Sequence, residues 1–312
     1  MARFKETIFV VLLAAGLLMP VNAFCADNPI GVVVDADALS IHEGPRVLLR
    51  YPYRDVPFKP YVQQLFTPNG INVLRDAPHD HLHHHALMYA IGVDGVNFWE
   101  EQKEPGRQLH RSFSNVTAGE RNNMPSAGFT EQLDWINPRG KELMLKESRT
   151  IEVCELDNVN ATFLTWQSSF TVPAGKESAI LSGSHYFGLG MRFLTSMDVG
   201  GRFRNSTGQA GEVVRGDERI ARAKWCAYAA EADGKPVTMA MFGHPDNVRD
   251  PTHWFTMTKP FAYLSATLNL YREPLKMTSP KPLVLRYAVA LWDGKVDDDR
   301  IEQVYRLWIK SN

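Results

Sequence analysis

The sequence predicts an all-β protein, an antiparallel two-sheet sandwich with a C-terminal helix. Short runs of alternating apolar and polar residues occupy most of the chain, as in strands that bury one face. The 22 glycines and 19 prolines are spread between these runs, where turns would join neighbouring strands. Helical periodicity is confined to the last residues. These three observations favour many antiparallel strands over a helical bundle.

The N-terminus has the three parts of a signal peptide. An uninterrupted apolar stretch, Ile8 to Met19, follows Arg3 and Lys5, and cleavage sites are available after Ala23 and Cys25. The stretch is shorter than the roughly 20 residues that span a bilayer. We therefore expect export and a soluble mature protein, in the periplasm or outside the cell.

No repeat, low-complexity tract or long linker divides the rest of the chain. We expect residues 1–26 to be the signal peptide and residues 27–312 to form a single β-sandwich domain. The clearest alternation predicts strands at 162–172, 262–270 and 283–291. Weaker patterns predict further strands at 30–34, 46–53, 71–74, 87–91, 108–116, 129–136, 148–156, 180–186, 211–214 and 237–242.

One helix is expected, at the C-terminus. Ile301, Val304, Leu307 and Trp308 fall on one helical stripe, and the three aspartates 297–299 supply a cap and favourable charge at its start. This helix would close the sandwich by packing its apolar stripe on a sheet.

Charge and motif content exclude several function classes. The 34 Lys and Arg nearly balance the 35 Asp and Glu, giving a net charge of -1, so no basic field exists for nucleic acid or an anionic membrane. The chain has no G-x-G-x-x-G, P-loop, G-x-S-x-G, H-E-x-x-H or C-x-x-C motif. Nucleotide-driven chemistry and the common serine hydrolases are therefore not expected. Cys154 and Cys226 either pair in an oxidising compartment or remain separate buried thiols.

A histidine run is the sharpest candidate site, because five of the ten histidines fall within residues 79–85. Imidazole can exchange protons near neutral pH and can bind transition metals, so the run suits acid–base chemistry or a metal site. An extended segment would place His79, His81, His83 and His85 on one face, aimed at one point.

Other residues could complete a cleft around this run. Trp99 offers a flat platform for a sugar ring, and Arg192 could bind hydroxyls or a carboxylate. Glu273 ends a strongly alternating strand, where loops meet and sites are commonly built. The remaining candidates for ligand contact are Tyr186, His244, Asn247 and Trp254.

Three stretches resemble a known family. They are the histidine run with the downstream Gly-Val-Asp-Gly-Val-Asn-Phe-Trp, then Gly-Leu-Gly-Met-Arg-Phe, then Gly-His-Pro-Asp-Asn-x-Arg-x-Pro-x-x-Trp. The chain resembles DUF6807, a bacterial family of exported proteins of unknown function that often carry the label "methane oxygenase PmoA". The similarity runs from about Tyr61 to Leu291, with His85 standing where many relatives have Arg. The label describes an integral membrane protein, whereas this chain has no spanning helix after its signal peptide.

The resemblance implies a galactose-mutarotase-like supersandwich and work on carbohydrate. The leading hypothesis is an exported carbohydrate-active enzyme of epimerase, lyase or hydrolase type, in which His79, His81, His84 and Glu273 exchange protons with a small sugar or oligosaccharide. One alternative is a metal enzyme, an oxygenase as the label suggests, in which His81, His83 and His85 bind a divalent transition metal. Another is a non-catalytic glycan-binding module.

Export is directly testable. Fractionation of the source cell should place a shortened chain outside the cytoplasm, because the charged start and the apolar stretch of residues 8–19 form a cleavable signal. N-terminal sequencing of the soluble fraction should begin near residue 24 or 26. A chain that begins at Met1 and sediments with membranes would contradict the prediction.

Overall fold

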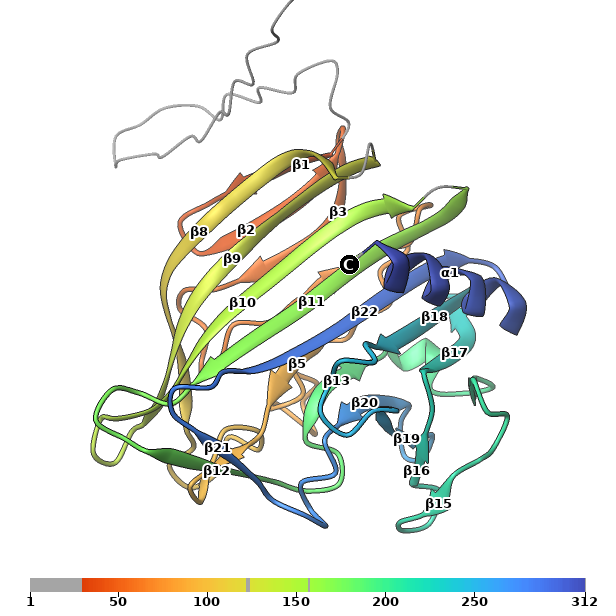
Figure 1. Ribbon diagram of the computed structural model, residues 1–312. Helices are drawn as coiled ribbons and strands as arrows, with labels where there is room; N and C mark the ends of the chain where they lie inside the picture. The colour runs from red at the N-terminus through yellow and green to blue at the C-terminus, as the bar shows by residue number, and fades with distance from the viewer. Residues whose placement is uncertain (1–29, 122–123, 157, 312) are drawn as a thin grey trace, which may run out of the picture.

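The computed structural model describes residues 30–121, 124–156 and 158–311, so the expected signal peptide lies outside the described residues. Antiparallel pairing joins all the strands of this part, and a single α-helix follows the last strand (Figure 1). The predicted all-β class with a terminal helix is confirmed. The strands form four sheets rather than the two that the sequence predicted.

An eight-stranded sheet forms the broad centre of the molecule (Figure 1). Its long strands come from consecutive hairpins, and the last strand of the chain inserts between two of these groups. In spatial order it contains β14 (Arg202–Asn205), β17 (Trp225–Ala232), β18 (Lys235–Gly243), β22 (Leu283–Asp293), β11 (Val159–Thr171), β10 (Glu142–Leu156), β9 (Met124–Asn137) and β8 (Arg107–Arg121).

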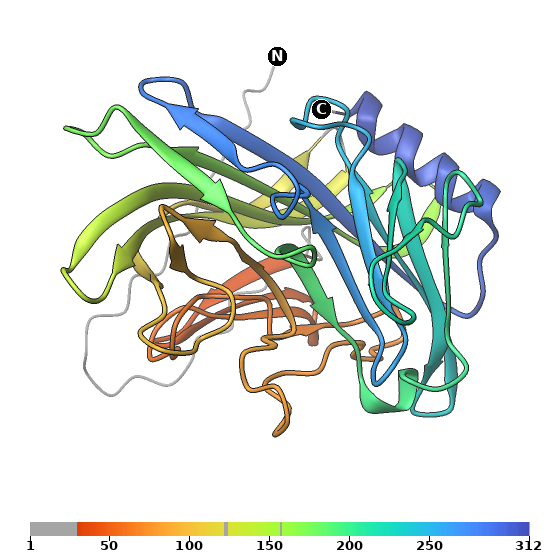
Figure 2. The same cartoon turned by 90° about the horizontal axis from the view of Figure 1, so that it is seen from below.

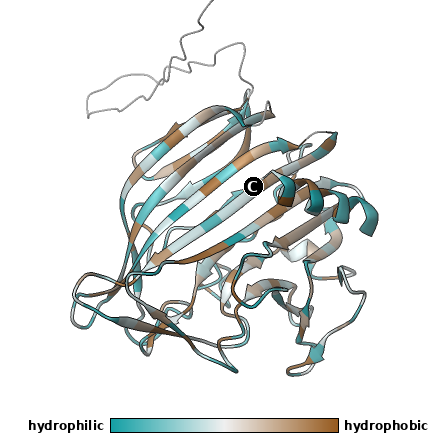
Figure 3. Cartoon of the chain, viewed as in Figure 1, coloured by the Kyte–Doolittle hydropathy of each residue, from teal (hydrophilic) through white to brown (hydrophobic). Residues whose placement is uncertain are grey.

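The two faces of this sheet bury different cores because successive side chains point to opposite sides. Val289 and Leu291 of β22 join the large interior cluster, whereas Ala288 and Ala290 pack under helix α1 (Asp298–Lys310). The alternation of apolar and polar residues is visible as brown and teal bands along the strands (Figure 3). The helix begins as expected, since the Asp297 side chain accepts a hydrogen bond from the Arg300 N–H.

Three smaller sheets lie on the interior side of the large sheet (Figure 2). One contains β1 (Ile30–Val34), β2 (Ala38–Glu43), β3 (Arg46–Pro52) and β4 (Gln64–Leu65). A second contains β21 (Leu275–Thr278), β12 (Ser178–Ser182), β6 (Gly92–Val93) and β7 (Val96–Asn97). The third, which carries the site, has the order β15 (Glu212–Val213), β16 (Arg219–Arg222), β19 (His253–Met257), β20 (Tyr263–Thr267), β13 (Gly188–Arg192) and β5 (Leu87–Ala90).

Several expected elements differ from the observed ones. Residues 71–74 make only isolated bridges instead of a strand. The run expected at 262–270 is a strand only from Tyr263 to Thr267, and every residue of it is buried. Its two faces are therefore both covered, so the alternation of large and small side chains does not mark a solvent face.

Cys154 and Cys226 are buried free thiols. Cys154 belongs to the cluster under α1, whereas Cys226 belongs to the interior cluster, so the two side chains project from opposite faces of the same sheet. This placement prevents the disulfide that remained open from the sequence. Burial raises the pKa of the Cys154 thiol to about 12, which keeps it protonated. In the part of the chain that the structure describes, no helix is long and apolar enough to cross a membrane.

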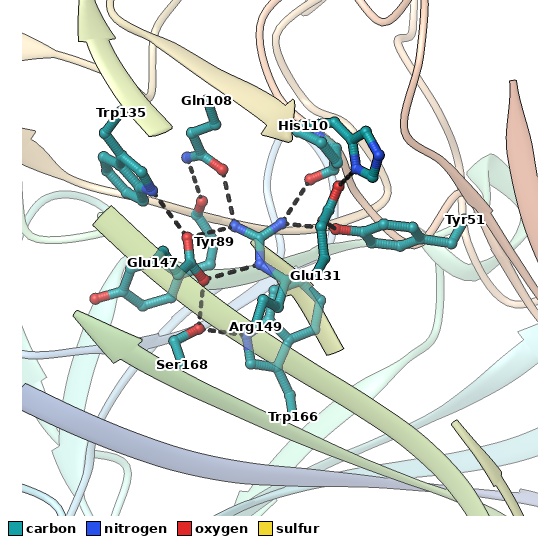
Figure 4. A network of polar contacts seen from close by, with 11 residues as sticks. Tyr51, Tyr89, Gln108, His110, Glu131, Trp135, Glu147, Arg149, Trp166 and Ser168 are labelled. Atoms are coloured by element: carbon teal, nitrogen blue, oxygen red, sulfur yellow. Dashed lines mark hydrogen bonds and ion pairs between the residues drawn. The ribbon is translucent and has the colours of Figure 1, made fainter. Parts of the chain in front are cut away.

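A fully buried ion pair joins Arg149 and Glu147, which lie two residues apart on β10 of the large sheet (Figure 4). The Arg149 guanidinium donates to both Glu147 oxygens at 2.8 and 2.9 Å, to the Pro60 carbonyl at 2.9 Å and to Gln108 at 2.8 Å. It also lies 4.8 Å from the Trp166 ring. Glu147 lies on the same strand as Arg149, whereas Gln108 lies on β8 and Pro60 in the loop between β3 and β4, so one cation links these three segments.

We expect Arg149→Met to destabilise the protein by about 3–5 kcal/mol, because it leaves the Glu147 carboxylate buried without its cation. Urea unfolding measures the change. Arg139→Met is a matched control, since the Arg139 side chain is 78% exposed and its ion pair with Glu104 lies at the surface. The control should change stability by less than about 1 kcal/mol. Equal effects of the two substitutions would contradict a structural role for the buried pair.

Candidate functional site

A cavity of about 480 Å³ opens beside the six-stranded sheet. The sheet supplies Phe255, Met257 and Tyr263 to its wall. The histidine run, the connections between β7 and β8 and between β12 and β13, and the turns between β15 and β16 and between β19 and β20 enclose the rest. Residues from five separate parts of the sequence therefore meet here.

The histidine run is folded into turns and is not extended as the sequence predicted. The His81 N–H donates to the Pro78 carbonyl at 2.8 Å, and the His84 N–H donates to the His81 carbonyl at 2.9 Å. As a result His81, His83 and His84 gather at the cavity, with ring centroids of His84 4.7 Å from each of the other two. His79 is exposed and does not line the cavity.

His84 is buried among aromatic rings. Its ring lies 5.2 to 5.3 Å, centroid to centroid, from those of Trp99, Phe261 and Tyr263. Burial, followed by the neighbouring His83 and His81, lowers the pKa of His84 to about 2. The imidazole is therefore neutral at physiological pH and suits a fixed hydrogen-bonding role better than that of a general base.

A carboxylate and a phenol form a direct pair in the wall of the cavity. The Tyr186 hydroxyl donates to Glu100 Oε1 at 2.7 Å, and Asn97 Nδ2 donates to Glu100 Oε2 at 3.0 Å. Asn97 also fixes the local backbone, because its Oδ1 accepts from the N–H groups of Trp99 and Glu100. Burial and the Glu100 carboxylate raise the pKa of Tyr186, so the hydroxyl stays protonated.

Apart from His81 Nδ1, which lies 3.2 Å from Asp80 Oδ2, three buried polar atoms at this cavity lack a polar partner: His84 Nδ1, Trp99 Nε1 and the Tyr263 hydroxyl. The three side chains are at most 5% exposed. Tyr263 reaches its position because residue 190 is glycine; a Cβ there would lie 1.7 Å from the Tyr263 oxygen. Buried donors and acceptors are nearly always paired, so three unpartnered polar atoms around one cavity indicate a binding site for a polar ligand.

Charged side chains stand at the remaining wall. Arg215 donates to Glu218 at 2.6 Å, and His185 Nε2 lies 3.2 Å from the other Glu218 oxygen. Asp217 accepts hydrogen bonds from the Thr258 hydroxyl and two backbone N–H groups, which lower the pKa of its carboxyl. The wall therefore carries both signs of charge.

His85 lies beneath the cavity and outside its lining. Its two ring nitrogens face Asp76 at 3.2 Å and Glu101 at 3.0 to 3.1 Å, and Glu101 also pairs with the buried Lys59. Only an imidazolium can donate to both carboxylates. Against the opposing effect of burial, these hydrogen bonds raise the pKa of His85 above its usual value.

The alternative metal site of His81, His83 and His85 is not assembled. His85 points to its two carboxylates, while His81 and His83 have ring centroids 5.8 Å apart in the cavity above. Within residues 30–121, 124–156 and 158–311, no group of three or more His, Cys, Asp or Glu side chains is placed to hold a metal ion.

Five further candidates lie away from the cavity. Glu273 is the clearest correction, because its side chain is 82% exposed and lies 3.7 Å from Arg249. The strand ends at Thr267, and the backbone then turns through Asn269, whose φ is 53°. This turn carries Glu273 to the surface instead of along the cavity wall.

The other four candidates have structural contacts. Arg192 lies 3.7 Å over the Phe261 ring and donates to the Ala262 carbonyl, so it supports the wall from behind. His244 packs against Trp308 of α1, and Asn247 pairs with the backbone of Arg286. The Trp254 indole donates to the Ala223 carbonyl. Of the expected ligand-contact residues, Trp99 and Tyr186 do line the cavity.

Glu100 and Tyr263 were missed as site residues. Glu100 follows Asn97 and Trp99 directly, and an acidic residue right after such a strand end was a usable signal. Tyr263 was not singled out, because no pattern in the sequence indicates that Gly190 on the neighbouring strand β13 leaves room for its hydroxyl.

The cluster around His85 predicts a pH window of stability. The pKa of His85 is raised, so its contribution is complete below about 6.5 and is lost as pH rises through the folded-state value. The pKa values of Asp76 and Glu101 are lowered, so their contribution is complete above about 4.5 and is lost in acid. We therefore expect the stability advantage of the native chain over His85→Gln to peak between about pH 5 and 6 and to shrink toward pH 9. Urea unfolding across that range measures it, and a constant advantage would contradict the charged state.

No curated protein matches this chain in sequence. Among solved structures, a galactose mutarotase related enzyme from Lactobacillus acidophilus is similar at 10% identity and a TM-score of 0.40, covering 86% of this chain and all of that one. The model of the family of unknown function DUF6807 matches residues 38–306, a longer stretch than the sequence motifs suggested. The chain therefore belongs to the family DUF6807.

Proposed function

We propose that the cavity binds a carbohydrate and exchanges protons with it, in a reaction of epimerase, lyase or hydrolase type. The observation that carries the proposal is the set of three unpartnered buried polar atoms, on His84, Trp99 and Tyr263, in one aromatic-walled cavity. We also propose that the chain meets this ligand outside the cytoplasm, as its N-terminal sequence suggests.

A sugar matches the chemistry of this wall. A pyranose has apolar ring faces that pack on aromatic rings and hydroxyls that both donate and accept hydrogen bonds. The indole N–H of Trp99 donates only, the Tyr263 hydroxyl does both, and a neutral imidazole has one donor and one acceptor. The volume of about 480 Å³ falls within the range of about 300–1,000 Å³ that small-molecule sites occupy.

Glu100 and Tyr186 are suited to the proton transfers. The Glu100 carboxylate can accept a proton from the sugar, while the protonated Tyr186 hydroxyl, 2.7 Å away, can supply one. His81 is a second proton carrier at the mouth of the cavity, with Asp80 3.2 Å from its Nδ1. Glu100 thus takes the role that the sequence analysis gave to Glu273, and His84 orients a hydroxyl instead of titrating.

Two substitutions test the proton transfers. Glu100→Gln and Tyr186→Phe should retain sugar binding and lower turnover by about 100-fold, the usual loss when a general acid or base is removed. A panel of neutral and acidic sugars, screened by ligand-observed NMR, identifies the ligand. Deuterium exchange and product formation on the bound sugars then measure turnover.

Glu273→Gln is the matched control, because this carboxylate is exposed and lies outside the cavity lining. It should leave turnover unchanged. If the native chain binds sugars but does not turn them over, the remaining hypothesis is a non-catalytic glycan-binding module. Equal losses for Glu273→Gln and Glu100→Gln would contradict the assignment of Glu100.

A further inference from the structure

A second cavity, of about 380 Å³, lies beside the first. Its wall combines an aromatic ring with cationic and neutral polar groups. Tyr271 is 64% exposed at this site, and its ring lies 5.9 Å from that of His185. Arg222, Arg272 and His253 also line the cavity.

Two polar atoms of this wall lack partners. His253 Nδ1 and Asn269 Oδ1 are buried and make no hydrogen bond. Burial, with the nearby charges of Arg222, Arg249 and Arg272, lowers the pKa of His253 to about 4, so its ring is neutral at physiological pH. The amide oxygen of Asn269 can accept a hydrogen bond from a ligand hydroxyl, and the neutral imidazole nitrogen of His253 can either donate or accept one, according to its tautomer.

The charge of the second cavity is positive. Arg222 is held at the wall because it donates to the Asp250 carbonyl at 2.9 Å. Arg272 pairs with Glu212, but both side chains are about 60% exposed, and such pairs contribute little and open readily. Two guanidinium groups against one carboxylate leave an excess of cationic donors, which suits a carboxylate or sulfate.

The two cavities share one face of the six-stranded sheet. On β19 the side chains of His253, Phe255 and Met257 point to the same side, and the first lines the second cavity while the other two line the first. The four steps from His253 to Met257 span about 13 Å along the strand, a length that successive units of an oligosaccharide can bridge. His185 and Tyr186 form the ridge between the cavities, each lining one of them.

We propose that the second cavity is a subsite for an acidic sugar unit, with its carboxylate or sulfate on Arg222 and Arg272 and its ring on Tyr271. The ligand of the protein is then an anionic oligosaccharide that occupies both cavities. This inference rests on the proposed carbohydrate site in the first cavity and deepens it.

Calorimetric titration of the full mature chain at low salt tests the subsite. The probes are a galacturonate trimer, a sulfated galactose oligomer of the same length and a neutral galactose trimer. At least one acidic probe should bind about tenfold more tightly than the neutral one, and the two acidic arms distinguish carboxylate from sulfate. The double substitution Arg222→Gln with Arg272→Gln should remove this preference and leave the neutral trimer unaffected.

Two further variants make the outcomes separable. Arg306→Gln is the charge-matched control, because Arg306 lies on α1 and is 70% exposed; it should change nothing. Tyr263→Phe removes only the unpartnered hydroxyl of the first cavity and should weaken all three probes by about tenfold.

Equal binding of acidic and neutral trimers, unchanged by the arginine substitutions but weakened by Tyr263→Phe, would overturn the subsite and leave the proposed function standing. Weakening by the arginine substitutions alone, with no effect of Tyr263→Phe, would overturn the shared ligand and the carbohydrate site of the first cavity. Absence of binding by all three probes would overturn both.

Discussion

The burial of the Arg149 guanidinium is the constraint on which the arrangement of this protein depends. A buried cation is tolerated only when its donors are satisfied, and here they hold Glu147 and Gln108 as well as the Pro60 carbonyl (Figure 4). The same Gln108 donates through its backbone N–H to the Phe58 carbonyl at 2.8 Å. One ion pair therefore sets where residues 58–60 cross the edge of the large sheet.

That short segment carries the constraint to the site. Lys59, between the two anchored carbonyls, is buried and pairs with Glu101, and Glu101 binds His85. Glu101 follows the Glu100 of the cavity wall, and His85 follows His84. One buried ionic cluster thus holds both segments that carry Glu100 and His84. Such preorganisation holds side chains in position without a ligand to order them.

The sequence predicts an element of this structure where the local residue pattern is compatible with one conformation only. Alternation located β22 and β11 within about three residues at each end, and the aspartate cap located the start of α1. At β20 the alternation predicted a strand but not its surroundings, because both faces of this strand are buried and alternation then does not distinguish a core face from a solvent face. Composition singled out the histidine run, but its turns bring His81, His83 and His84 together instead of the rings of His79, His81, His83 and His85. The position of Glu100 after Asn97 and Trp99 marked it as a candidate, but its hydrogen-bond partner Tyr186 lies 86 positions later in the chain, and no sequence pattern joins the two.

The buried polar groups differ between two neighbouring regions of the interior in whether they have hydrogen-bond partners. The charged groups of Arg149, Glu147 and His85 are paired by hydrogen bonds or ion pairs with other residues, and only the buried Tyr89 hydroxyl beside Arg149 has no partner among the described residues of these two clusters. Around His84 three buried polar atoms are left unsatisfied, each at a cost of about 1–3 kcal/mol. The buried charges of Arg149 and His85 are thus paired within the protein, whereas the buried polar atoms around His84 are not. This contrast supports the proposal that the unpartnered atoms form hydrogen bonds with hydroxyls of a ligand, bonds that would offset this cost.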